Sequence, residues 1–160
     1  MENKYTVTFY FAKARARYYK DPKDQTIIEH SLGGNAWFVV RNETTGKSQS
    51  SGFQSKNNEP FGPGDITGGD KASYIDIAHS TTIQLDETQY NRLLALHHYN
   101  GFDASTYNVA THNCVSYVFR ALNLIGYNPG NINPGSRYSD KLKQLGISMD
   151  AVNEPSDAIL

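Results

Sequence analysis

Cys114 is the only cysteine among the 160 residues, and its place in the sequence makes it the first candidate for chemistry. Apolar side chains recur at helical spacing from Val115 to Ile125, directly after Asn113, so a helix is predicted to begin beside the cysteine. A helix N-terminus favours thiolate over thiol, and its backbone N–H groups can receive an oxyanion. Because a thiolate is the attacking species in acyl transfer, the pattern favours a cysteine nucleophile over the packed thiol that a lone cysteine more often is.

The elements that would position this cysteine are strands with clear patterning. Apolar and polar residues alternate along 5–11, which predicts a strand with one buried face. The apolar run at 36–41 predicts a second strand, and 48–54 is its hairpin partner across the turn-rich segment 42–46. Together with the helix at the cysteine, they predict an α+β fold.

The rest of the chain is predicted from caps and turn residues. Asp86 can cap a helix, and Gln89 three residues later can complete a capping box. The other segments are predicted as short strands at 74–77 and 81–85, a glycine- and proline-rich loop at 57–70, a solvated edge or loop at 13–20, and a short helix at 139–145. No repeat or linker interrupts the sequence, so residues 1–160 are expected to form a single domain.

Composition restricts the classes of function. Hydrophobic residues make up 38% and charged residues 19%, as in soluble globular proteins. The net charge of −1 gives no general argument for nucleic acid or an anionic membrane as partner. One cysteine and five scattered histidines give no metal-ligand spacing, and the glycines at 62–69 form no phosphate-binding loop, so no cofactor is expected.

Nothing in the pattern suggests a membrane segment or a secretion signal. No apolar run approaches the ~20 residues of a membrane span. The stretch Met1 to Tyr10 is polar and alternating, unlike a signal peptide. The chain is therefore expected to be cytoplasmic in the cell that makes it, or to leave that cell by a route that needs no cleaved signal.

Five motifs occur in an order that is similar to that of a known group of enzymes. They are Gly-Gly-x-Ala-Trp-Phe-Val-Val at 33–40, Ser-Gly-Phe-Gln at 51–54, Gly-Pro-Gly at 62–64, Leu-Asp-Glu-Thr-Gln-Tyr-Asn-Arg-Leu at 85–93, and Asn-Cys-Val-Ser-Tyr-Val-Phe-Arg-Ala-Leu at 113–122. This order resembles the circularly permuted papain-like (NlpC-like) cysteine hydrolases found among bacterial type VI secretion effectors and related toxin domains. The resemblance covers residues 32–128, and the two helix motifs are its more specific parts.

The resemblance implies a fold, a function and a set of partners. The implied fold is a permuted papain-like one, in which an antiparallel sheet packs against the helix that bears the nucleophile. The resemblance implies a peptidoglycan amidase or endopeptidase in which Cys114 attacks an amide of the peptide stems or cross-links, and a base at position 35 takes its proton. It further implies an antibacterial toxin that a secretion apparatus or its carrier delivers into the periplasm of a competitor. A cognate immunity protein that plugs the cleft belongs to the same expectation.

One residue departs from the family pattern. The family carries its histidine base just before the Ala-Trp strand, where this sequence has Asn35. Asparagine has no titratable ring and cannot act as a general base at neutral pH. The chain is then a natural homologue without catalysis, an enzyme that uses another histidine, or an inactive variant in which the base was replaced.

The five histidines are the alternatives for the base. His30 stands five residues before position 35, and a loop could bring it in. The others have more ordinary roles. His112 leads into a helix, His97 and His98 lie late in a helix where a cation suits the dipole, and His79 lies in a turn between strands.

The residue that would orient the base is expected on the neighbouring strand. If the hairpin turns near residues 44–45, Asn35 lies opposite Gln54 on the same face of the sheet. Glutamine can hold an imidazole, although an ordinary strand-end role is the commoner one. Ser51 and Ser55 have the opposite parity and would face the other side. The predicted catalytic positions are therefore Cys114, Asn35 and Gln54.

Two other functions stay open from the sequence. Permuted papain-like folds also act on acyl chains, so an acyltransferase or lipid hydrolase could use the same cysteine. A non-catalytic module that binds wall peptides or a protein partner would need no base, and Asn35 would be natural in it.

Overall fold

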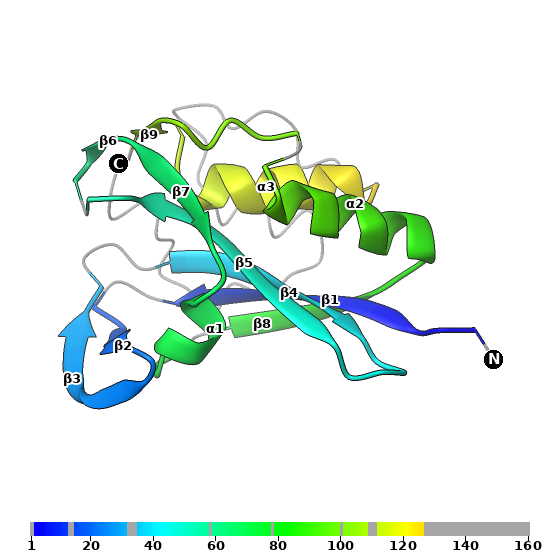
Figure 1. The fold of residues 1–160 in the computed structure, drawn as a ribbon, viewed down its shortest axis with the longest axis horizontal. Coiled ribbons are helices and arrows are strands. Elements are labelled where there is room, and N and C mark those ends of the chain that lie inside the picture. The colour runs from blue at the N-terminus through cyan, green and yellow to red at the C-terminus, as the bar shows by residue number, and fades with distance from the viewer. Residues whose placement is uncertain are drawn as a thin grey trace.

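The centre of the protein is a five-stranded antiparallel sheet (Figure 1). The computed structural model describes residues 2–12, 15–31, 35–57, 59–77, 79–99, 101–108 and 112–126. The strands of the sheet lie in the order β7-β5-β4-β1-β8, with bounds β1 Tyr5–Ala12, β4 Asn35–Asn42, β5 Ser48–Ser55, β7 Gly64–Thr67 and β8 His79–Leu85. The predicted α+β class with an antiparallel sheet is confirmed at this level.

Three helices and two small sheets complete the described part of the chain. The helices are α1 Asp70–Ser73, α2 Glu87–His97 and α3 Cys114–Leu124. The small sheets pair β2 (Arg17–Asp21) with β3 (Asp24–His30), and β6 (Phe61–Gly62) with β9 (Tyr107–Asn108). The helices α2 and α3 lie side by side on one face of the large sheet, whereas α1 and the β2–β3 hairpin lie on the other (Figure 1).

The main core lies between the sheet and the helices α2 and α3. Val7, Phe9 and Phe11 of β1 are fully buried, as their alternation predicts, and Phe9 is paired with the buried Phe38 of β4. α3 contributes its own buried face, made of Val115, Tyr117, Val118, Phe119, Ala121 and Leu122. Burial of each large apolar side chain stabilises the fold by roughly 1.5–3 kcal/mol, so the position of α3 on the sheet is well fixed.

A second, smaller core lies on the opposite face of the sheet. Trp37 is fully buried there and packs with Ala12 and Ala16. The rings of Tyr10 and Tyr74 flank the Trp37 ring, at centroid distances of 5.5 and 4.9 Å. Because Tyr74 directly follows α1, these contacts hold α1 against β4.

The hairpin of β4 and β5 has the predicted register. Phe38 is paired with Ser51 and Arg41 with Ser48, which centres the turn between residues 44 and 45. The same register, continued to the start of β4, sets Asn35 opposite Gln54. Alternation along β4 directs residues 36, 38 and 40 to the helices, so these two polar residues belong to the face that carries α1.

The segments around α1 differ from the prediction. The strand predicted at 74–77 is wrong, because Tyr74 makes only a single bridge with Tyr18 and no strand follows it. The segment 57–70, predicted as a loop, contains β6, β7 and the first residue of α1. β7 is a strand because it pairs with the edge of β5, a long-range contact that the glycines and prolines in the sequence hide.

Two other predictions have different outcomes. For the segment 13–20, the predicted solvated edge agrees with the structure from Arg17 onward, where β2 is a mostly exposed strand of a two-stranded hairpin. The short helix predicted at 139–145 lies outside the described residues. The helix predicted from Asp86 is confirmed, and Asp86 and Gln89 form the predicted capping box.

Candidate active site

Cys114 is the first residue of α3, and Asn113 caps that helix. Asn113 Oδ1 accepts hydrogen bonds from the backbone N–H groups of Val115 (3.0 Å) and Ser116 (3.3 Å), and Ser116 Oγ accepts one from Asn113 N–H (3.1 Å). This capping box explains why the helix begins at the cysteine. The backbone N–H groups of Cys114 and Val115 act on the thiol and lower its pKa, in the manner expected of a helix start.

Asn35 and Cys114 meet at the backbone N–H of Ala36. This N–H donates to Asn35 Oδ1 at 2.9 Å, and it also acts on the Cys114 thiol, whose pKa it lowers. Asn35 is 8% exposed and Cys114 is 4% exposed. The fold therefore brings the start of β4 to the first turn of α3, and it places the two residues predicted as base position and nucleophile beside one peptide group.

Gln54 reaches this site through a carboxyl that the sequence analysis missed. Its Nε2 donates to Thr67 Oγ1 at 2.6 Å and to Asp70 Oδ1 at 3.0 Å. The Asn35 side chain also lies beside the Asp70 carboxyl and lowers its pKa. Asp70 thus connects Gln54 with position 35, and no local signal in the glycine-rich segment could have identified it.

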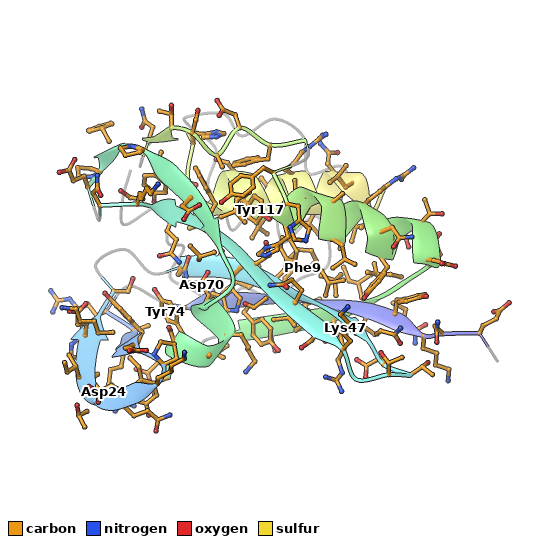
Figure 2. The ribbon with its side chains drawn as sticks, viewed as in Figure 1. Phe9, Asp24, Lys47, Asp70, Tyr74 and Tyr117 are labelled. Carbon is orange, nitrogen blue, oxygen red and sulfur yellow. The ribbon has the colours of Figure 1, made fainter. Side chains whose placement is uncertain are left out.

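The Asp70 carboxyl is buried without a compensating charge. It is 4% exposed and lies on the face of the sheet opposite Tyr117 of α3 (Figure 2). Its Oδ2 has no hydrogen-bond partner among the described residues. Burial raises its pKa to about 7, and the Asn35 and Gln54 amides oppose only part of that rise.

Gly52 on β5 makes room for this carboxyl. A Cβ atom at position 52 would collide with Asp70 Oδ2 and would lie 3.2 Å from Trp37 Cβ. We therefore expect Gly52→Ala to lower the free energy of unfolding by about 1–3 kcal/mol, the usual cost of overpacking. Urea unfolding measures this, and Gly69→Ala is the matched control.

The control residue stands next to Asp70 but has open space around it. Nothing lies within 4 Å of a Cβ at Gly69, and its φ of −95° suits any residue. Gly69→Ala should change the free energy of unfolding by no more than about 0.5 kcal/mol. Equal effects of the two substitutions would mean that Asp70 is not held against Gly52.

The Cys114 thiol is protonated at neutral pH in this structure. Burial raises its pKa to about 11, and the charge of Asp70 raises it further, whereas the N–H groups of Ala36, Val115 and Cys114 lower it. The expectation that the helix start would lower the pKa below that of a free cysteine is therefore wrong for the chain with Asn35. The N-terminal effect is present, but the loss of solvent outweighs it.

The histidines occupy other places. His112 Nε2 lies at hydrogen-bond distance from the Asp103 carbonyl, and its ring stacks on Phe102 at 4.6 Å. His30 ends β3, and its charge acts on Asp76 rather than on the thiol. His98 caps α2, and His79 begins β8, so the turn predicted at His79 is wrong.

His97 belongs to a hydrogen-bonded chain on the helix side of the sheet. Its Nδ1 is 2.8 Å from Ser51 Oγ, which is 2.6 Å from the hydroxyl of Tyr117. Burial lowers the pKa of His97, and the neighbouring His98 adds to this. Ser51 therefore faces the helices, as its parity predicts, and this histidine serves the core rather than the thiol.

The described part of the chain contains neither a metal-binding cluster nor a membrane-spanning helix. There, no three or more His, Cys, Asp or Glu side chains gather to hold a metal ion, and no helix is long and apolar enough to cross a membrane. Comparisons of the chain with protein-family models, curated proteins and solved structures found no match.

Proposed function

We propose that this chain is a permuted papain-like cysteine hydrolase that acts on peptidoglycan as an amidase or endopeptidase, with Asn35 at the position of the catalytic base. One observation carries the proposal: Cys114 opens α3 and meets position 35 at the Ala36 N–H. A helix start and a polar neighbour are features that a thiolate nucleophile uses. The sequence resemblance supplies the substrate class.

The proposed reaction needs an imidazole at position 35. The proton of Cys114 Sγ moves to that imidazole while the sulfur attacks the carbonyl carbon of the amide. The oxyanion is received by the Cys114 N–H and a neighbouring donor. The proton then passes to the leaving amine as the C–N bond breaks, and water hydrolyses the thioester that is left on Cys114.

Asn35 interrupts this sequence at its first step. It has no group that can take the thiol proton, and the pKa of about 11 keeps Cys114 protonated at neutral pH. The same observation favours a second candidate function, a non-catalytic module that binds wall peptides or a protein. The two functions are distinguished by what a histidine at position 35 restores.

The biological setting is proposed from the resemblance alone. The chain would be made in the cytoplasm, delivered by a secretion apparatus or its carrier, and active in the periplasm of a target cell. An immunity protein in the producing cell would bind over the active site.

Digestion of purified sacculi tests the proposed function. The Asn35→His variant is expected to release fragments with a broken stem or cross-link amide, which mass spectrometry identifies. The double variant Asn35→His/Cys114→Ala should release none. Absence of cleavage by Asn35→His, with retention of the protein on sacculi, would favour the binding module instead.

A further inference from the structure

Asp70 lies beside position 35 and takes no part in the proton transfer between Cys114 and that position. The Gln54 amide donates a hydrogen bond to its carboxyl at 3.0 Å, and the absence of a side chain at Gly52 leaves room for the second carboxyl oxygen. Its second oxygen, Oδ2, makes no hydrogen bond with the described residues. A buried carboxylate with an unused oxygen is costly unless a cationic or hydrogen-bonding partner completes it.

No cation among the described residues completes this carboxyl. The titratable groups on which its charge acts are Cys114 of α3 and Tyr74 at the end of α1, and neither is cationic. Lys71 is next to Asp70 in the sequence, but its ammonium lies over the Tyr10 ring, 5.2 Å from the centroid. The Asn35 amide is the other side chain, besides Gln54, that acts on this carboxyl.

An imidazole at position 35 would share its first side-chain atoms with the asparagine. Asparagine and histidine both branch at Cγ, so histidine Nδ1 can occupy the position from which the Asn35 amide acts on Asp70. Nδ1–H would then donate to the carboxylate, and Nε2 would extend to the thiol. The Ala36 N–H now donates a hydrogen bond to Asn35 Oδ1 at 2.9 Å. Without that acceptor, it would be free to donate to the sulfur.

We propose that Asp70 is the positioning residue of this site: its carboxylate is built to pair with an imidazolium at position 35, and Gln54 holds Asp70 rather than the base. This inference deepens the proposed function and rests on it. It replaces Gln54, the polar residue expected to orient the base, with a carboxylate from α1 that Gln54 supports. It also makes Asn35 the residue that leaves the site incomplete.

The experiment is an NMR titration of the new imidazole in the Asn35→His variant. Its signal is identified as the one histidine signal that is absent from the spectrum of the unchanged chain. A carboxylate partner raises an imidazole pKa by about 1–3 units. Adding Asp70→Asn should lower that pKa by at least about 1 unit. Adding Asp103→Asn, which removes an exposed carboxylate, should change it by less than about 0.3 unit because solvent and salt screen surface charges.

The double variant Asn35→His/Gln54→Leu distinguishes Asp70 from Gln54 as the partner of the imidazole. In it, the imidazole pKa should fall by less than in Asn35→His/Asp70→Asn. A larger effect of Gln54→Leu, or no effect of Asp70→Asn, would overturn the proposal. Since the titration uses no substrate, a coupled imidazole with no hydrolysis would count against the proposed function alone.

A measurement without an Asp70 variant covers the case in which Asp70→Asn does not fold. The carboxyl carbon of Asp70 should titrate near pH 7 in the unchanged chain and at least about 2 units lower in Asn35→His. An unchanged Asp70 pKa in Asn35→His would overturn the pairing.

Discussion

Asn35→His is expected to raise the rate of peptidoglycan hydrolysis by about 10²–10⁴-fold over the unchanged chain. General acid–base catalysis contributes a factor of this size, and Asn35 cannot provide it. The rate should be compared as kcat/KM on a soluble stem peptide, with release from sacculi as a second readout. It should also acquire a pH dependence from the new imidazole, which the unchanged chain lacks.

Asn35→Gln is the matched control, because it lengthens the side chain without adding a titratable ring. It should give no increase in rate. Full activity of the unchanged chain would show that another residue takes the proton of Cys114, and it would contradict the assignment of position 35.

The second large effect is on stability, where Asp70→Asn is expected to stabilise the folded chain at pH 8 by about 2–4 kcal/mol. The folded-state pKa of Asp70 is raised to about 7 from an ordinary value of 3.8. The native state therefore binds this proton more tightly than the unfolded state does. The contribution of Asp70 to the free energy of unfolding is therefore fully present below pH 3.8 and is lost as the pH rises through 7.

Asparagine keeps the shape of the carboxyl and cannot ionise, so Asp70→Asn removes this loss. Urea unfolding at pH 4 and pH 8 should show a gain at pH 8 and a change within about 1 kcal/mol at pH 4. Burial lowers the pKa of His97, but this histidine is present in both proteins and its contribution cancels in the difference. Asp103→Asn should give no gain at pH 8, because Ser105 hydrogen bonds lower the pKa of that exposed carboxyl. A loss of stability at pH 8 on Asp70→Asn would mean that the carboxylate is compensated in the native state.

The parts of the site that the sequence could predict are those with local signals. The start of α3 follows from Asn113 and the apolar spacing after Cys114, and the capping box with Ser116 confirms it. The register of the β4–β5 hairpin, in which Phe38 is paired with Ser51, follows from turn residues that lie a few positions away. Such features depend on hydrogen bonds within one helix or one hairpin.

The parts that could not be predicted depend on packing between distant segments. Asp70 reaches position 35 because β7 pairs with β5 and because Trp37 and Tyr74 hold α1 against the sheet. None of this can be seen in a run of glycines and prolines. The raised pKa of Cys114 has the same origin, since its burial is set by the whole core whereas the helix N-terminus is a local feature.

The central claim is that Cys114 is a nucleophile controlled by position 35, and the pH dependence of its alkylation by iodoacetamide tests this directly. In the unchanged chain the rate should be very low at pH 7 and should still rise near pH 11, following the raised pKa of the thiol. In Asn35→His an imidazolium stabilises the thiolate, so the rate at pH 7 should be at least about 10-fold higher and should level off at lower pH. The same profile in both proteins, or complete protection of the thiol in both, would show that Cys114 is a structural residue and would contradict the account.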